Sequence, residues 1–488
     1  MNWQLGVVVL CGASSLATSL GQAYSMQQLT TVSHHLTDSP ALRAWTDVFP
    51  MAGALLGCLL SWLPLRYLGR RATLQLVVAP LLSAGCCLTF VFCHITRVAS
   101  PVLLLGVSLQ GAALGVGFSA IPVYLLETMC FPCNTYSHTR CAPALIIATQ
   151  LCAAIGTLLA SVFPISPNTK YLHLIPATIM TVSALGMCLT NESPRWLLLF
   201  GQRVEHAKAS LKQLQSQLQL QGYSDPDIII CQATEWFQKD EEQFCARNVN
   251  IAVVRTYLRA LSLAACLLSL PSMSGVHVYD FYSKWAFKFA GVFITDRNIS
   301  LSVLRDSMRV AAVTIALGVL FVANGARSQC VSLIISTGTI SIALGATGMF
   351  LFSLEQGENW KWSVLWLPLV IHIVFQTVFW FGVGSQTFIT AYQFTPTPLR
   401  PSIISLAGGL HWLLEITVNK FLFFMIDTIH PFGTYWFYCG TSATGLVLIV
   451  FMIVPEISMN RATINVARSQ VKCEMETGKQ ACSSPQYK

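Results

Sequence analysis

Three ionisable side chains stand within stretches that are otherwise apolar, and their chemistry is the first clue to function. His277 and Asp280 are three residues apart, so on a helix they lie on nearly the same face, while His411 stands in a later apolar stretch. A neutral imidazole offers one donor and one acceptor and can also take up a proton. The two histidines therefore have three explanations: contacts to a bound solute, proton sensing, or packing in a core beside a satisfied neighbour. Asp280 is either functional or a carboxylate near an interface that reaches water.

A second group of residues has the spacing of metal ligands. Cys130, Cys133, His138 and Cys141 form the pattern C-x2-C-x4-H-x2-C, whose four side chains could surround zinc. The chain contains 17 cysteines, however, so chance explains such a spacing better than a site does. Most of the cysteines stand singly inside apolar stretches, where cysteine acts as a small hydrophobe. We predict no bound metal, no disulfide framework and no cofactor.

The composition indicates what kind of elements position these residues. Apolar residues make up 54% of the 488 positions and charged residues only 10%, far more apolar than a soluble core requires. Apolar runs of about 20 residues recur about twelve times, each long enough to cross a bilayer as a helix. The runs lie near residues 5–23, 46–65, 74–93, 101–125, 142–163, 171–190, 256–282, 308–326, 330–353, 362–385, 402–426 and 434–454. We predict an all-α membrane protein with twelve transmembrane helices.

The order of the runs predicts two six-helix bundles. Residues 1–190 form the first bundle, 191–250 a cytoplasmic helical connector, 251–456 the second bundle, and 457–488 a disordered cytoplasmic tail. Basic residues gather on the side of the connector, which predicts that both termini are cytoplasmic, in the plasma membrane. The sequon at Asn298 then faces outward and is expected to be glycosylated. The net charge of +8 reflects this bias, and no compact basic domain suggests nucleic-acid binding.

Three short motifs carry a family resemblance. They are Tyr67-Leu68-Gly69-Arg70-Arg71, Val123-Tyr124-Leu125-Leu126-Glu127, and Asn191-Glu192-Ser193-Pro194-Arg195. In this order they resemble the sugar porters of the major facilitator superfamily, with weaker similarity to the insect trehalose-transporter-like branch. The resemblance implies a conformational latch between the bundles, made of charges that break and reform. Its members would be Arg70, Arg71, Glu127, Arg140, Glu192, Arg195 and Arg400. The alternative is that these charges only set the topology.

The resemblance also implies a solute site at mid-membrane, which departs from the family pattern. Gln150 matches a sugar-contacting glutamine, and His411-Trp412 matches an Asn-Trp pair. His277 stands where the family has asparagine, and Phe388 where it has a tryptophan that packs on the sugar. With Asp280, these are the expected substrate-binding residues. A hexose could still bind, but the usual set of hydroxyl contacts is gone.

The leading hypothesis is facilitative transport of a sugar or polyol by alternating access, with a small polar solute and the lipid bilayer as partners. Two alternatives remain: a transporter-like receptor or sensor that no longer transports, and a proton-coupled carrier of a non-sugar solute. No nucleotide-binding loop, metal-hydrolase motif or nucleophile arrangement stands out, so we expect no enzyme. The sequence leaves the solute and the oligomeric state open.

Overall fold

Helices account for the regular structure of the described chain. The computed structural model describes residues 3–36, 46–94, 100–129, 138–164, 169–199, 205–207, 251–289, 298–322, 326–356, 366–396 and 399–453, and no strand occurs among them. By length and composition, nine helical stretches of this described part could cross a membrane. One of the nine, Arg400–Met452, is 53 residues long and bends midway, so it covers two spans. The all-α membrane fold is therefore confirmed.

The first bundle contains six spans. They are α1 (Trp3–Leu36); α3 (Val48–Leu60) with α4 (Trp62–Tyr67); α5 (Arg70–Thr73) continued through the π-helical turn η1 (Leu74–Val78) into α6 (Ala79–His94); α7 (Ser100–Met129); α8 (His138–Val162); and the 3-10 turn η2 (Lys170–Leu174) with α9 (Ile175–Met187). The short helix α10 (Pro194–Leu199) follows. Beyond it, most of the predicted connector lies outside the described residues, so the predicted domain limits stay predictions.

The second bundle repeats this layout. Its elements are α13 (Ile251–Met273) with α14 (Val276–Phe289); α15 (Asn298–Val322); α16 (Ala326–Glu355); α17 (Leu367–Phe381) with α18 (Val383–Phe394); and α19 (Arg400–Leu448) with the π-helical turn η5 (Ile449–Ile453). Helix α19 turns at His430, where φ is 61°, just before Pro431, so its two arms form the last two spans. Because α15 begins at Asn298, the sequon lies in the first turn of that helix.

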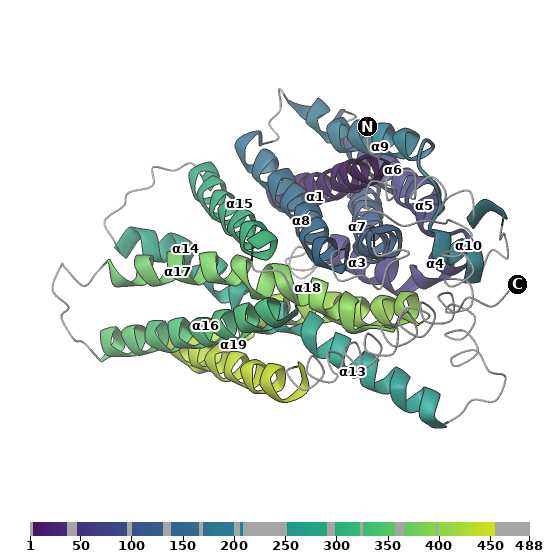
Figure 1. Ribbon diagram of the computed structural model, residues 1–488. Coiled ribbons are helices and arrows are strands. Elements are labelled where there is room, and N and C mark those ends of the chain that lie inside the picture. The colour runs from purple at the N-terminus through teal and green to yellow at the C-terminus, as the bar shows by residue number, and fades with distance from the viewer. Residues whose placement is uncertain are drawn as a thin grey trace, which may run out of the picture.

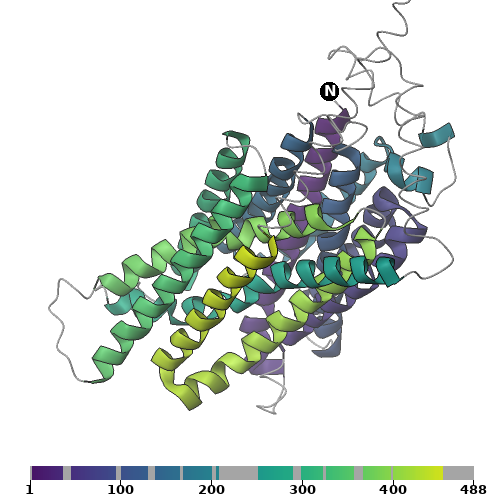
Figure 2. The ribbon, with the colours of Figure 1, turned by 60° about the horizontal axis from the view of Figure 1, so that its bottom comes forward.

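The two bundles lie side by side and each has its own core. In Figure 1 the purple-to-blue helices of the first bundle and the teal-to-yellow helices of the second form two groups, with α15 beside α8 where they meet, and in Figure 2 teal and green helices of the second bundle pass in front of purple helices of the first. One buried cluster belongs to the first bundle and includes Leu82 and Tyr124; another, with Leu267 and Phe375, belongs to the second. A smaller cluster joins the bundles, and it contains Val123, Ile146, Ile147, Val313, Ile389, Tyr392 and Ile404.

Helices α3 and α7 approach each other closely because four glycines face each other. Gly53 and Gly57 stand four residues apart on α3, and Gly111 and Gly115 four apart on α7. A Cβ built on Gly111 would lie 2.0 Å from the Pro50 carbonyl oxygen, and one on Gly115 would lie 2.1 Å from the Ala54 carbonyl oxygen. Such small-residue faces let helix backbones pack where lipid supplies no hydrophobic drive.

Two spans of the second bundle are broken halfway. Gly275, between α13 and α14, has a φ of +79°, which only glycine adopts without strain, and the Thr441 hydroxyl donates to the Met273 carbonyl at 2.8 Å. Gly382, between α17 and α18, has φ −110° and ψ −85°, and a Cβ there would lie 2.0 Å from the Ser336 hydroxyl oxygen. Breaks of this kind are tolerated inside a membrane where the protein itself satisfies the backbone.

We predict that Gly111→Ala lowers the thermal unfolding midpoint of the purified protein by several degrees, because the added methyl group forces α3 and α7 apart at a cost of about 1–3 kcal/mol. Gly318→Ala is the matched control, since a Cβ at Gly318 has no described atom within 4 Å. Fluorescence-detected unfolding in detergent measures both. Equal midpoints for the two variants would contradict the close approach of α3 and α7.

Candidate functional site

The helix break at Gly275 places polar side chains against α19. The Ser272 hydroxyl, just before the break, donates to Glu415 Oε1 at 2.8 Å and lies 3.2 Å from His411 Nδ1. His277, just after the break, brings its Nε2 to 2.8 Å from Glu415 Oε2. His411 and Glu415 are four residues apart on α19 and so share a face. A carboxylate, two imidazoles and a hydroxyl thus meet inside the apolar interior.

Aromatic rings from both bundles cover this polar group. Phe118 of α7 stacks on His411, with ring centroids 5.8 Å apart and planes at 12°. Phe388 of α18 meets Phe118 edge-on at 5.2 Å and His411 edge-on at 5.6 Å. Trp412 lies 6.3 Å from Phe118, and its indole Nε1 is buried without a hydrogen-bond partner among the described residues. The arrangement offers donors, acceptors and ring faces, the groups that bind a polyhydroxylated ring.

The predicted substrate-binding residues fall into two groups. His277, Phe388, His411 and Trp412 come together at this site. Asp280 lies one turn further along α14, where its Oδ1 accepts from Gln376 Nε2 at 2.9 Å, so it faces α17 instead. His411 is only 6% exposed and packed among rings, whereas the His277 side chain is 21% exposed. That these residues contact a solute stays a prediction.

Gln150 belongs to the surface between the bundles but makes no hydrogen bond or ion pair with these four residues. It is half-buried on α8, and Ile146 and Ile147, four and three residues earlier, pack in the cluster that joins the bundles. Helical spacing therefore turns Gln150 toward the second bundle. Its amide makes no hydrogen bond to another described residue, so it remains available for a solute.

Two residues of the site were missed from the sequence. Glu415 stands inside the apolar run 402–426, four residues after His411, and that spacing was a sufficient signal for a shared helix face. Phe118 carried no comparable signal, because one aromatic residue in an apolar helix is ordinary. Only the packing of α7 against α18 and α19 gives it a role.

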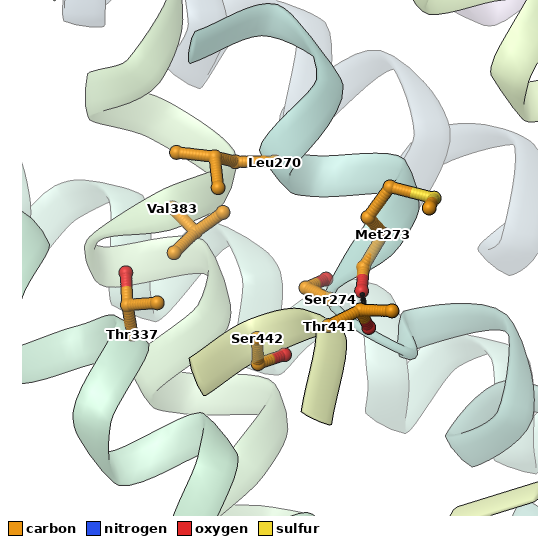
Figure 3. A pocket seen from close by; sticks show the side chains of 7 residues that line it. All are labelled: Leu270, Met273, Ser274, Thr337, Val383, Thr441 and Ser442. Carbon is orange, nitrogen blue, oxygen red and sulfur yellow. Dashed lines mark hydrogen bonds between the residues drawn. The ribbon is translucent and has the colours of Figure 1, made fainter. Parts of the chain in front are cut away.

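A small cavity lies beside the two helix breaks. It is lined by Leu270, Met273, Ser274, Thr337, Val383, Thr441 and Ser442. Figure 3 shows the hydroxyl groups of Thr441 and Ser442 close to Ser274, with Thr441 bonded to the backbone at Met273. Every lining residue belongs to the second bundle, so this cavity is not a passage between the bundles. It marks the place where both broken spans meet.

Four of the predicted latch charges, Arg70, Arg71, Glu127 and Glu192, gather at one end of the first bundle, which we call the connector end. Arg70 Nε lies 2.8 Å from Glu127 Oε2, and the Ser193 hydroxyl donates to the same oxygen at 2.7 Å. The carboxylate of Glu192 accepts the backbone N–H groups of Arg70 and Arg71 at 2.8 and 2.9 Å, which caps α5. The Arg71 guanidinium donates to the Thr190 carbonyl. Both carboxylates are therefore engaged inside the first bundle.

Arg195, Arg400 and Arg140 are the remaining predicted latch residues. Arg195 and Arg400 are buried, 7% and 8% exposed, and Arg400 Nη2 donates to the Thr395 carbonyl at 3.2 Å. The side chain of Arg140 lies outside the described residues, so the expected pair between Glu127 and Arg140 has no test, and Glu127 instead bonds Arg70 and Ser193. A latch between the bundles stays a prediction for this set.

The four residues with zinc-ligand spacing also lie, wholly or in their side chains, outside the described part of the chain. Cys130 and Cys133 are outside the described residues, and so are the side chains of His138 and Cys141 in the first turn of α8. Elsewhere in the described ranges, no group of three or more His, Cys, Asp or Glu side chains could hold a metal ion.

Polar contacts join the bundles near both ends. At the connector end, the Ser61 and Ser405 hydroxyl oxygens are 2.6 Å apart, and the Tyr392 hydroxyl donates to the Phe118 carbonyl. At the opposite end, Lys420 and Asn419 donate to Asp47, and the Ser161 hydroxyl donates to Asp306. Asp47 lies just before the second span and Asp306 in the first half of the eighth, which is the corresponding span of the second bundle. These contacts join the two bundles on both sides of the central site.

A model of the family described as "Sugar (and other) transporter" matches residues 11–463. The chain belongs to this family. The facilitated trehalose transporter Tret1 of Drosophila willistoni is 25% identical over 448 residues, covering 91% of this chain, and Tret1 of Culex quinquefasciatus is 26% identical over 458 residues, covering 93% of it. The chain spans 48% of the first relative's length and 82% of the second's.

Solved structures confirm the fold. The proton:xylose symporter XylE, a major facilitator superfamily protein bound to 6-bromo-6-deoxy-D-glucose, gives a TM-score of 0.73 at 14% identity, covering 93% of this chain and 97% of its own. The human organic anion transporter MFSD10 gives 0.57 at 11% identity, covering 91% and 99%. The prediction of two six-helix bundles with the major facilitator fold is confirmed.

Cysteines at positions 61 and 405 should cross-link, because the two serine hydroxyl oxygens are 2.6 Å apart and a disulfide needs close Cβ atoms. We expect mild oxidation of the double variant Ser61→Cys/Ser405→Cys to give a disulfide-linked peptide pair in mass spectrometry. Native Cys58 lies near the Ser405 carbonyl, at 3.7 Å, so the test uses a Cys58→Ala background with each single cysteine as a control. Failure of the pair to form at all would contradict the contact between Ser61 and Ser405 at the connector end.

Proposed function

We propose that this chain carries a sugar or polyol across a membrane down its gradient, by alternating access between the two bundles. The observation that carries the proposal is the site between the bundles, where Glu415, His277 and Ser272 meet under the rings of Phe118 and Phe388. Hydroxyl groups of a solute can pair with such donors and acceptors while an aromatic face covers the ring. Membership in the sugar transporter family and similarity to facilitated trehalose transporters support it.

The arrangement gives each part a role in transport. The solute would enter when one pair of end contacts opens and leave when the other opens, while the helix breaks at Gly275 and Gly382 let α14 and α18 move against α13 and α17. Transport of this kind needs no cofactor and no covalent chemistry. The chain's relatives are transporters, in line with our expectation that it is not an enzyme.

We predict that proteoliposomes containing the protein take up labelled trehalose, glucose or a polyol without a pH gradient. Glu415→Gln should lower that uptake about tenfold or more, because the change leaves the His277 and Ser272 donors without their shared carboxylate. Glu355→Gln is the matched control, since the Glu355 side chain is 48% exposed near His430. Uptake that requires a proton gradient would contradict facilitation, and binding without any flux would indicate a sensor.

We propose further that the connector end and both termini face the cytosol, in the plasma membrane. The Lys and Arg bias supports this orientation. We therefore expect glycosylation at Asn298 and none at Asn191 when the full chain is made in cells that glycosylate. Digestion with a glycosidase, compared with Asn298→Gln, measures it. A sugar on Asn191 with none on Asn298 would invert the orientation.

A further inference from the structure

Arg309 is a charged residue to which the proposed transport mechanism gives no role. It lies on α15, and its guanidinium carbon is 3.9 Å from the centroid of the Trp380 ring. Its Nε is buried without a hydrogen-bond partner, and none of the described residues makes a hydrogen bond or an ion pair with its guanidinium. An ionisable group placed this deep in a membrane protein is costly unless it pairs with something.

The nearby acids are already engaged. Asp306, three residues earlier on the same helix, accepts from the Ser161 hydroxyl and lies 3.4 Å from Arg305 Nε. Asp280 accepts from Gln376 Nε2 at 2.9 Å. Arg309 therefore has no carboxylate of the described residues within ion-pair distance, although two lie in its neighbourhood.

Contact with the Trp380 ring leaves the guanidinium donors without a described partner. A guanidinium is planar, and its N–H groups point outward in that plane. Its carbon lies over the ring, and none of its N–H groups bonds a described residue, so they still present a fork that matches a carboxylate. The contact with the indole also restrains the side chain, which reduces the ordering cost of binding.

The position of Arg309 is on the surface between the bundles. Val313, Leu317 and Leu320 follow it at spacings of four, eight and eleven residues, so all four share one helix face, and those three pack in the cluster that joins the bundles. Trp380 packs against the same cluster and against the core of the second bundle. Figure 1 shows α15 beside α8, where this face meets the first bundle.

We propose that Arg309, in contact with the Trp380 ring, is a carboxylate-binding subsite, and that the chain accepts a polyhydroxylated carboxylate, that is, a sugar acid. The hydroxyl groups of such a solute suit the site at Glu415 and His277, and its carboxylate supplies the partner that Arg309 lacks. Bidentate pairing of Arg with a carboxylate is among the strongest charge-assisted hydrogen bonds. The inference rests on the proposed function in placing the solute between the bundles.

The test measures ligand-induced thermal stabilisation of the purified full chain, which needs no transport. The probes are D-glucuronate, its methyl ester and D-glucose. They share the ring, and only glucuronate carries a charge. We expect glucuronate to bind at least about tenfold more tightly than the ester or glucose, because only glucuronate has a carboxylate that can accept hydrogen bonds from the Arg309 guanidinium. Arg309→Gln should remove that preference and leave the weak binding of glucose unchanged, while Arg309→Lys should restore only part of it.

Arg255→Gln is the matched control, because Arg255 is an exposed arginine in the first turns of α13. Equal binding of glucuronate and its ester by the native chain would overturn the subsite, and so would an undiminished preference in a folded Arg309→Gln or Arg309→Lys variant. Uptake of glucose without any glucuronate preference would overturn the subsite and leave the transport proposal intact. Glucuronate binding that depends on Arg309, in a chain with no flux of any sugar, would support the subsite and overturn transport.

Discussion

The structure depends on one constraint: a backbone amide in hydrocarbon has no water to bond, so each span must satisfy its own polar groups. This requirement explains why the described spans are helical and why the mid-span breaks at Gly275 and Gly382 lie in the protein interior. The break at Gly275 is covered by Thr441, and the break at Gly382 lies against Ser336. Because the breaks sit inside the second bundle, they bring His277 to the centre and let α18 present Phe388 toward the first bundle.

Much of the fold could be predicted from the sequence, because its physical cause is local. Apolar runs of sufficient length predicted the spans, and the order of three motifs predicted the family. Four of the six expected substrate-binding residues meet at one place, since each stands at mid-span of a helix that faces the other bundle. Asp280 turned toward Gln376, a partner on another span that helical periodicity alone could not identify.

The rest of the site depends on how helices pack, which the sequence does not reveal position by position. Glu415 completes the polar group only because α13, α14 and α19 meet, and Phe118 matters only because α7 crosses toward α18. Similarly, the glycines of α3 and α7 were four among 31 until the structure placed them face to face. The sequence also suggested that Glu127 and Glu192 work between the bundles, whereas their described partners tie the connector end of the first bundle together.

At each end of the molecule at least one contact between the bundles is weak, and this bears on how readily that end opens. A neutral hydroxyl pair such as Ser61 with Ser405 contributes about 1 kcal/mol, and a partly exposed ion pair such as Asp47 with Lys420 contributes roughly 0–1 kcal/mol. Neither end therefore holds the molecule firmly shut. In the proposed transport cycle, breaking contacts of this size costs little more than thermal energy supplies, so opening either end is not limited by these contacts.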